Sequence, residues 1–385
     1  MHKTVVRDAV HGNIELSALE EKIVDSKEMQ RLRFVRQLST AYLVYPSAQH
    51  SRFEHSLGAM HLSGVLAKKL EFDKQEAQLL RLAALLHDVG HGAFAHDTDE
   101  LILQRTGKLH EERGIEMVAS GQIGKEIEKS GLELEDLFSV MEGKGSGGML
   151  TSDLGADRID YLLRDAYFTG VSYSLIDAER LMDSVVFRKG EVMITEKGRL
   201  AAESLLISRH FMFNAVYYHP TVRISKQMLK TSVSNALKEG KIGLDDVALG
   251  TDYALLEKLA SFSPLAQRIF ERRLYKKAVV VDAHSSSFYE KFLSSKKAES
   301  EIDHALESAG FAKGEFAVCM PESSAKKFSV KMEKADGEVE ELAKTSPLIR
   351  ALQQPSDAGK LIVACHEKQV HKAQKALARL LKLQT

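Results

Sequence analysis

Four side chains that can bind a metal or transfer a proton crowd into the segment RLAALLHDVGHGAFAHD. They are His87, Asp88, His91 and His96, and the first two end an apolar stretch with helical spacing. Imidazole nitrogens and carboxylate oxygens are common ligands of divalent cations, and histidine also titrates near neutral pH. A His-Asp pair alone is weak evidence in a chain with 15 histidines, so the groups that accompany it decide its meaning.

Two flanking segments supply further groups of the same kinds. Upstream, PSAQHSRFEHSLG contains two histidines beside an arginine and a glutamate: His50, His55, Arg52 and Glu54. Downstream, SDLGADRIDYLLRDAYFTG carries Asp153, Asp157, Asp160 and Asp165, interleaved with Arg158, Tyr161 and Arg164. On a helix, Asp157, Tyr161 and Asp165 share one face, since they are spaced at i, i+4 and i+8. Burying such a stripe is costly unless a metal or a polar ligand occupies it.

The composition limits what can accompany these groups. Cys319 and Cys365 are the only cysteines, too few for a disulfide framework or a thiolate zinc site, so any metal must be held by histidines and carboxylates. Lys and Arg number 53 and Asp and Glu 54, and the resulting net charge of −1 does not attract a polyanion. An anionic substrate therefore needs a local cluster of cations. Nucleic-acid binding is not indicated, although local basic patches would permit it.

The elements that position these residues are mainly helices. The chain has 385 residues, 44% of them hydrophobic and 28% charged, enough for a sizeable globular core. No proline occurs between Pro46 and Pro220, and segments such as AQLLRLAALLHD place apolar residues at helical spacing, which predicts a helical core. We predict one or two amphipathic helices over residues 20–45, with Ser26 as an N-cap, and a long helix from about Ser152 to Ala166.

The pattern of apolar residues changes from helical spacing to short β-branched runs after about Leu274. Short β-branched runs, KKAVVVDA, GEFAVCM, KFSVKM and KLIVACH, indicate strands, and HKAQKALARLLKL indicates a last amphipathic helix with a basic face. We therefore expect a mainly α protein with two domains. The first would cover residues 1–275, with a metal-site core at about 48–220, and a smaller α+β domain would cover 276–385.

His55, the pair His87-Asp88 and Asp157 follow one another in an order that resembles the H…HD…D signature of the HD-domain phosphohydrolases. Neighbouring segments, QLSTAYLVYPSAQHSRFEHSLG, LLHDVGHGAFAH, HEERG and ADRIDYLLRDAYFTG, are similar to the deoxynucleoside triphosphate triphosphohydrolase branch, which includes dGTPases and SAM-and-HD-domain dNTPases. The similarity covers about residues 1–275 and continues only in outline beyond RRLYKKAV. Two sibling branches do not match, because the chain lacks the GYP tripeptide of cyclic-dinucleotide phosphodiesterases and the Glu-Asp pair that follows the HD in alarmone hydrolases.

The resemblance implies an HD-domain helical core that holds a divalent metal ion. Its ligands would be His55, His87, Asp88 and Asp157, with Asp153 as the alternative for the last position. Two imidazoles and two carboxylates suit Mn²⁺, Mg²⁺, Fe²⁺, Zn²⁺ or Ni²⁺. The reaction implied is attack of water at the α-phosphorus of a dNTP, with dGTP among the candidate substrates, which releases a deoxynucleoside and triphosphate.

The resemblance also assigns proton transfer. His96 matches the catalytic histidine of the HGxFxH element and would protonate the 5′-oxygen that leaves. Asp88 could also orient or deprotonate the attacking water. His91 and His110 match neighbouring histidines on the phosphate side, although His110 could equally belong to a solvated helix start.

Substrate contacts follow from the same comparison. Three arginines match positions that contact the α-phosphate, the phosphate chain and the terminal phosphate, respectively Arg52, Arg158 and Arg209. Gln37 and Asp165 match the partners of the sugar 3′-hydroxyl, and Tyr161 lies beside them. Tyr217 matches the aromatic residue that packs against the sugar edge, where a rigid wall would exclude a 2′-hydroxyl.

A second nucleotide site and self-association are further implications. Asp25, Gln30 and Arg33 match residues that read an activating guanine nucleotide at a subunit interface, but the lysine that accompanies them there is Thr4 here. The same residues could be structural, with Asp25 starting a helix and the other two on its exposed face. We expect a homo-oligomer, at least a dimer, with GTP or a dNTP as candidate activator.

Two other functions stay open at this level. One is an HD phosphohydrolase that acts on another nucleotide or phosphate ester, and the other is a nucleotide-sensing or nucleic-acid-binding protein with a vestigial metal site. The complete ligand set argues against the latter, because a decayed site tolerates the loss of a ligand. The first residues lack the apolar core of a signal peptide, and no uncharged apolar stretch approaches about 18 residues, so we expect a cytoplasmic protein without a membrane segment.

Overall fold

The computed structural model describes residues 4–174, 176–282, 285–321, 328–352 and 360–383. The chain forms two compact units. Unit 1 consists of Met1–Met212, Leu244–Tyr253 and Phe328–Ala351, and unit 2 consists of Phe213–Gly243, Ala254–Lys327 and Leu352–Thr385. The chain thus passes between the units several times. The division into domains at residues 1–275 and 276–385 stays a prediction.

Unit 1 is mainly helical, as expected. Its α-helices are α1 (Ala18–Val24), α2 (Lys27–Arg31), α3 (Arg52–Lys69), α4 (Lys74–Leu86), α5 (His96–Thr106), α6 (His110–Ser120), α7 (Gln122–Lys129), α8 (Leu134–Met141), α9 (Gly148–Thr151), α10 (Ala156–Thr169), α11 (Ala178–Ser184), α12 (Arg199–Met212), α14 (Leu244–Ala248), α19 (Leu342–Thr345) and α20 (Pro347–Leu352). Short 3₁₀ turns are η1 (Leu32–Phe34), η2 (Ser39–Leu43), η3 (Gly145–Gly147) and η4 (Glu196–Gly198). The predicted cap is confirmed, because the Ser26 hydroxyl accepts the backbone N–H of Met29 at the start of α2.

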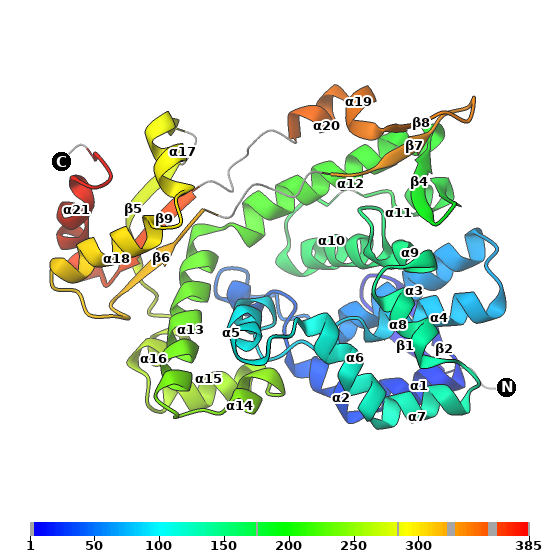
Figure 1. The fold of residues 1–385 in the computed structure, drawn as a ribbon, viewed down its shortest axis with the longest axis horizontal. Coiled ribbons are helices and arrows are strands. Elements are labelled where there is room, and N and C mark those ends of the chain that lie inside the picture. The colour runs from blue at the N-terminus through cyan, green and yellow to red at the C-terminus, as the bar shows by residue number, and fades with distance from the viewer. Residues whose placement is uncertain (1–3, 175, 283–284, 322–327, 353–359, 384–385) are drawn as a thin grey trace. The chain divides into compact units, whose positions relative to one another are not determined.

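Helices α3, α4, α8 and α10 form the centre of unit 1 (Figure 1). The apolar residues that predicted α4 are buried there, and Leu80, Leu82 and Leu85 have no exposed surface. Each fully buried leucine contributes about 2 kcal/mol to the stability of the fold. Helix α3 packs against both α4 and α10, so the segments that carry the chemically interesting residues meet in one core.

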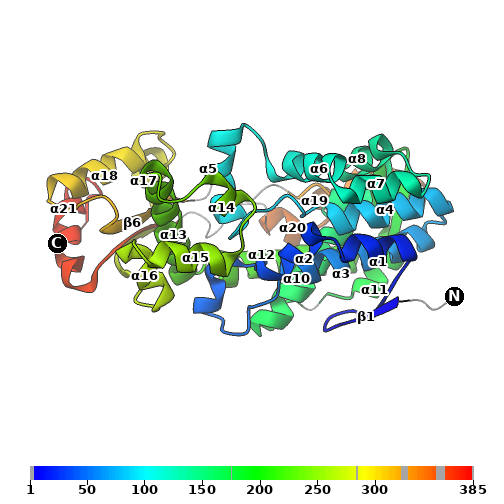
Figure 2. The same cartoon turned by 90° about the horizontal axis from the view of Figure 1, so that it is seen from below.

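Unit 1 also contains strands, most of which the sequence pattern did not predict. Strands β1 (Thr4–Asp8) and β2 (Gly12–Leu16) form an antiparallel hairpin, and β2 contacts α3 (Figure 2). A second sheet has the order β3-β4-β7-β8, from β3 (Val185–Arg188), β4 (Glu191–Thr195), β7 (Lys331–Glu333) and β8 (Val339–Glu341). The sequence pattern did not predict β3 and β4, which lie within the stretch that predicts the helical core. Strand β3 pairs with β4 in a local hairpin, and β4 also pairs with β7, more than a hundred residues downstream.

Unit 2 contains the smaller α+β region that the sequence predicts. Its sheet has the order β5-β9-β6, from β5 (Lys276–Asp282), β9 (Lys360–Cys365) and β6 (Phe316–Cys319). Its helical elements are the π-helical turn η5 (Phe213–Tyr217), α13 (Pro220–Lys238), α15 (Asp252–Ala260, of which the first two residues belong to unit 1), α16 (Pro264–Phe270), α17 (Ser287–Leu293), α18 (Ala298–Ser308), the 3₁₀ turn η8 (Glu367–Gln369) and α21 (Val370–Ala378). The run KFSVKM yields β7 rather than a strand of this sheet, and its first residue, Lys327, lies outside the described ranges. Both cysteines are buried in this sheet, as expected for inert core residues.

The hairpin β1–β2 is tied to α10 by a buried ion pair. Asp8 accepts hydrogen bonds from Arg164 and from the backbone N–H groups of Val10 and His11. Burial alone would raise the pKa of Asp8, but these donors lower it below its ordinary value. Because the folded pKa is lowered, the contribution of ionised Asp8 to stability is present above about pH 4 and is lost as the pH falls through the folded pKa.

We predict that Asp8→Asn lowers the free energy of unfolding by about 1.5–3 kcal/mol at pH 7, the usual worth of hydrogen bonds to a charged group. The deficit should shrink as the pH falls through the lowered pKa of folded Asp8, where the wild-type carboxyl loses its charge. Urea unfolding of both proteins in EDTA at pH 7 and at acidic pH measures it. An equal deficit at both pH values would contradict the ionic origin.

Candidate active site

The predicted metal ligands lie at the ends of three helices of unit 1. They are His55 in the first turn of α3, His87 and Asp88 at the end of α4, and Asp157 in the first turn of α10. A capping box fixes the start of α3, where the Ser51 hydroxyl accepts the N–H of Glu54 and the Glu54 carboxylate accepts the N–H of Ser51. Helix ends leave room for ligand atoms to face one another, because the chain turns away there.

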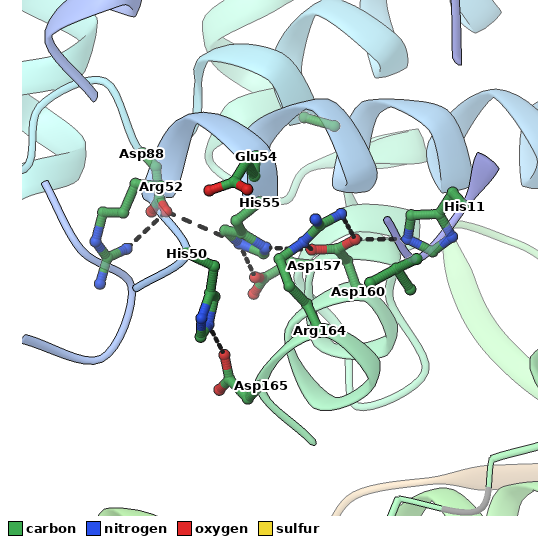
Figure 3. Close-up of polar contacts among 12 residues, drawn as sticks. His11, His50, Arg52, Glu54, His55, Asp88, Asp157, Asp160, Arg164 and Asp165 are labelled. Atoms are coloured by element: carbon green, nitrogen blue, oxygen red, sulfur yellow. Dashed lines mark hydrogen bonds and ion pairs between the residues drawn. The ribbon is translucent and has the colours of Figure 1, made fainter. Parts of the chain in front are cut away.

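The four side chains point into one space. Asp157 Oδ1 lies 3.0 Å from His55 Nε2 and 3.7 Å from His87 Nε2. Asp88 Oδ2 lies 3.8 Å from His55 Nε2, and Asp88 Oδ1 lies 3.5 Å from His87 Nε2. Ligand atoms of His55, His87 and Asp88 are all within 4.8 Å of one another. Figure 3 shows His55, Asp88 and Asp157 turned toward one another.

The hydrogen bonds of the two rings leave their other nitrogens available for a cation. His87 Nδ1 donates to the carbonyl of Ala84 at 2.7 Å, and His87 Nε2 is buried without a hydrogen-bond partner among the described residues. His55 Nδ1 donates to Asp160 Oδ2 at 2.7 Å. Both rings therefore turn an Nε2 lone pair toward the carboxylates, which is the arrangement that metal-binding histidines adopt.

The electrostatics of this cluster favour positive charge. Burial would lower the pKa of His55, but hydrogen bonds to Asp157 and Asp160 and the nearby charge of Asp88 raise it to about 10. Burial would raise the pKa of Asp157, yet the two histidines hold it well below its ordinary value. Two imidazoles and two carboxylates at these distances fit a hard-to-borderline divalent cation, which would supply the positive charge that the carboxylates attract.

A second group of titratable side chains adjoins the first. Three histidines surround one carboxylate oxygen, Asp99 Oδ2. Its distance is 3.2 Å to His91 Nδ1, 3.2 Å to His96 Nδ1 and 3.3 Å to His110 Nδ1. His91 Nε2 lies 3.3 Å from Asp88 Oδ1 and so connects the two groups. Burial and the charge of Arg52 lower the pKa of His91 to about 3, so this ring is neutral at pH 7. The three predicted histidines therefore share one partner.

Our sequence reading missed Asp99, although a signal was present. Asp99 lies three residues after His96 in α5, so the two share a helix face. Burial would raise the pKa of Asp99, but hydrogen bonds from the histidines hold it well below its ordinary value. Asp99 also accepts from Arg113 at 3.0 Å. This carboxylate is therefore ionised and positions the histidine group.

The loop before α5 adopts strained backbone that a distant residue stabilises. Phe94 and Ala95 have positive φ angles of 61° and 46°, which residues other than glycine rarely adopt. The buried Asp252 accepts the N–H of Phe94 through Oδ1 at 2.6 Å and the N–H of Arg36 through Oδ2 at 3.0 Å. No local sequence signal identifies Asp252, because it lies more than 150 residues from this loop. Its carboxylate aligns the segment that leads into His96.

The predicted phosphate-binding arginines occupy two places. Arg52 Nη1 donates to Asp88 Oδ2 at 2.6 Å, and its buried Nε has no hydrogen-bond partner among the described residues. Arg158 and Arg209 instead both contact Asp153, with 3.1 Å between Arg209 Nη1 and Asp153 Oδ1. Asp153, the alternative metal ligand, therefore pairs with these two arginines, whereas Asp157 contacts the histidines.

The residues expected at the sugar lie in both units. Asp165 Oδ1 is 2.8 Å from His50 Nε2 (Figure 3). The His50 ring stacks on Phe168 with centroids 4.8 Å apart. The Gln37 backbone N–H donates to the carbonyl of His50, and its side-chain Oε1 is buried without a hydrogen-bond partner in the described chain. Tyr161 lies beside Arg158, which opposes the rise that burial causes in the tyrosine pKa. Tyr217 lies in η5 of unit 2, so its contact with the sugar stays a prediction.

The residues expected to read an activator make local contacts. Gln30 Nε2 donates to the carbonyl of Val24, and Arg33 Nε donates to Gln30 Oε1 at 2.8 Å. The Arg33 guanidinium lies 3.7 Å above the Phe53 ring, and Asp25 is the C-cap of α1 rather than the start of a helix. These contacts match the structural alternative in part, and the activator site stays a prediction.

A helical unit in which helix ends bring His, His-Asp and Asp together defines an HD-type hydrolase. In agreement, the HD domain model matches residues 52–164, and the HD associated region model matches residues 176–385. The chain belongs to the HD-domain phosphohydrolase superfamily, in the branch similar to dNTP triphosphohydrolases. HD domains are metal-dependent, so the cofactor is a divalent metal ion.

Several relatives have curated sequences. The chain is 39% identical over 295 residues to an uncharacterized protein of Methanocaldococcus jannaschii, which covers 75% of this chain and 62% of that protein. It is 31% identical over 312 residues to the uncharacterized protein YwfO of Bacillus subtilis, covering 70% and 71%. It is 28% identical over 258 residues to the deoxynucleoside triphosphate triphosphohydrolase SAMHD1 homolog of Dictyostelium discoideum, covering 60% and 49%. The matched part is thus less than two thirds of the first and third of these proteins.

Solved structures share the fold over nearly the whole chain. A hypothetical protein from Aquifex aeolicus has a TM-score of 0.81 and 29% identity, covering 98% of this chain and 100% of that chain. A phosphohydrolase from Bacteroides thetaiotaomicron has a TM-score of 0.76 and 22% identity, covering 94% and 100%, and this likeness concerns the fold alone. Among the described residues, no helix is both long and apolar enough to cross a membrane.

Proposed function

We propose that the protein hydrolyses dNTPs to deoxynucleoside and triphosphate. The observation that carries the proposal is the convergence of His55, His87, Asp88 and Asp157 next to the histidine group around Asp99. One group fits a divalent cation, and the other offers ring nitrogens that can transfer a proton. The Dictyostelium relative, whose name states dNTP triphosphohydrolase activity, supports this choice of substrate.

The metal-site residues and the phosphate-binding residues have separate tasks. A divalent cation held by the four ligands supplies a Lewis acid for the phosphate and makes water a better nucleophile. Asp88, one of the four ligands, also pairs with Arg52. The guanidinium of Arg52 neutralises the charge of the Asp88 carboxylate and directs it. The Nε of Arg52, which has no hydrogen-bond partner within the described part of the chain, is a donor suited to an α-phosphate oxygen.

Proton transfer to the leaving 5′-oxygen falls to His96. Its side chain is 66% exposed, whereas the rings of His91 and His110 are buried or nearly so, which makes it the ring open to a substrate. Asp99 pairs with His96 Nδ1 and orients the ring, so the opposite nitrogen would be the one that delivers the proton. His91 and His110 would then face the phosphates.

The remaining substrate contacts extend the proposal. Arg158 and Arg209 share Asp153, and a bound polyphosphate would compete for the same guanidinium groups. The buried Oε1 of Gln37 is an acceptor suited to the 3′-hydroxyl. Asp165 and Tyr161, which lie one turn apart on α10, would be further contacts of the sugar. Tyr217 would wall off a 2′-hydroxyl. Homo-oligomerisation and activation by GTP or a dNTP at Asp25, Gln30 and Arg33 belong to the same proposal.

A product analysis tests the reaction. Purified protein is incubated with each dNTP in Mn²⁺ or Mg²⁺, with and without GTP added as an activator. A separate incubation offers GTP alone as the substrate. The products are separated by ion-exchange chromatography. We expect deoxynucleoside and triphosphate in equal amounts, with little turnover of GTP. Monophosphate and pyrophosphate would reject the cleavage position, and turnover of other phosphate esters alone would reject dNTPs as substrates.

A further inference from the structure

Asp160 lies directly behind a metal-ligand candidate. Its side chain has no exposed surface, and its Oδ2 accepts a hydrogen bond from His55 Nδ1 at 2.7 Å. Because it holds the Nδ1 proton of His55, Asp160 directs the opposite nitrogen toward the cation site.

Asp160 is itself held by two donors. His11 Nε2 donates to Asp160 Oδ1 at 2.6 Å, and Arg164 donates to both oxygens at 2.9 and 3.0 Å. Arg164 has no exposed surface and also donates to Asp8 Oδ2 at 2.8 Å. The network therefore runs from the hairpin β1–β2 through α10 to α3, and Figure 3 shows its His11, Arg164, Asp160 and His55 members.

The hairpin presents His11 by the shape of its turn. Asp8 Oδ1 accepts the N–H groups of Val10 and His11 at 2.9 and 2.8 Å, which closes the turn after β1. Gly12 ends the turn with a φ of 75°, a conformation that favours glycine. The same carboxylate that shapes the turn is thus anchored to Arg164, so the position of His11 is coupled to the buried network.

A glycine on α3 makes room for this arrangement. A Cβ atom at Gly58 would lie 1.8 Å from Asp160 Oδ1 and 2.4 Å from a terminal nitrogen of Arg164. Gly58 lies one turn after His55, so α3 can approach Asp160 closely only because this position has no side chain. The close approach and the hydrogen bonds act on the same carboxylate.

We propose that the N-terminal hairpin is part of the metal centre, with His11 as a positioning residue. His11 and Arg164 hold Asp160, and Asp160 orients His55 so that its Nε2 meets the cation. The Asp160 carboxylate that accepts the Nδ1 proton also makes His55 a stronger ligand. The inference deepens the proposed function and rests on it only for the presence of a cation at His55.

Mn²⁺ affinity of the full chain tests the inference without reference to a substrate. Mn²⁺ binding to apo-protein is measured by equilibrium dialysis and by competition with a chelator, for wild type, His11→Ala and His11→Gln. Partners of metal-bound histidines typically contribute 10- to 100-fold in affinity, so we expect the Kd for Mn²⁺ of His11→Ala to rise by about that factor. His11→Gln keeps an N–H donor and should recover part of the loss.

Controls separate orientation from folding. His61→Ala removes a ring whose centroid lies 5.5 Å from that of His11, and it should leave the Kd for Mn²⁺ within about twofold of wild type. Asp160→Asn, which keeps the volume of the side chain, should weaken Mn²⁺ binding as His11→Ala does. Thermal unfolding in EDTA verifies that each variant is folded.

The outcomes distinguish this inference from the proposed function. Wild-type Mn²⁺ affinity in a folded His11→Ala and a folded Asp160→Asn would overturn the inference and leave the proposed function intact. Failure of the wild-type protein to bind any divalent cation would instead reject the metal site itself. If His11→Ala does not fold, the comparison of His11→Gln and Asp160→Asn with wild type decides.

Discussion

Asp157→Ala is expected to lower kcat/KM for dNTP hydrolysis about a thousandfold or more. Asp157 Oδ1 contacts both candidate ligand histidines, so its removal would leave a bound cation with one carboxylate and two imidazoles. A metal ion contributes several kcal/mol of transition-state stabilisation, and about 4 kcal/mol corresponds to a thousandfold in rate. Steady-state kinetics with Mn²⁺, together with metal analysis of the purified proteins, measures the effect. The metal content of the variant should fall in parallel.

Matched variants make this result specific. Asp136→Ala removes an exposed aspartate of α8 and should retain wild-type kinetics. Asp153→Ala would remove the partner of Arg158 and Arg209 and should keep its metal, which separates the two candidates for the fourth ligand. Equal activity of Asp157→Ala and wild type would remove the catalytic claim and favour a binding protein with a vestigial site.

His96→Ala is expected to lower kcat for dNTPs about 10²- to 10⁴-fold, the usual contribution of general acid catalysis. The KM and the content of metal bound at the proposed site should change little, because His96 is not one of the four proposed ligands His55, His87, Asp88 and Asp157. In the proposed reaction the leaving 5′-oxygen is strongly basic, and protonation by His96 would relieve the charge that develops on it as the bond breaks. A p-nitrophenyl phosphodiester has a leaving group that needs no proton, so its hydrolysis should be much less affected.

Two comparisons test this assignment of His96. Asp99→Asn keeps the shape of the partner but removes its charge, and it should reproduce part of the kcat loss. His304→Ala removes an exposed histidine of α18 in unit 2 and should leave kcat unchanged. An equal loss of activity toward dNTPs and the p-nitrophenyl ester in His96→Ala would show that His96 acts in binding or in nucleophile activation, not as the acid.

The helical core and the metal-ligand candidates could be predicted because their signals are local. The apolar spacing of AQLLRLAALLHD predicts α4 and places His87 and Asp88 at its end, where they lie near Asp157 and His55 respectively. Strands β3 and β4 could not be predicted with equal ease, because their ladder is completed by β7 far along the chain. Asp99 could have been found from its spacing to His96, since both lie on one helix face.

By itself, the sequence determined the chemical groups, the helices that end at them and the resemblance to the HD-domain phosphohydrolases. Only the tertiary structure decided which carboxylates are buried beside which cations. Asp160 and Asp153 are aspartates of the same segment and cannot be told apart from the sequence alone. In the structure, Asp160 accepts a hydrogen bond from His55, whereas Asp153 pairs with Arg158 and Arg209. The difference arises because burial raises the cost of an unpaired charge, so the role of each carboxylate depends on the partner that packing brings to it.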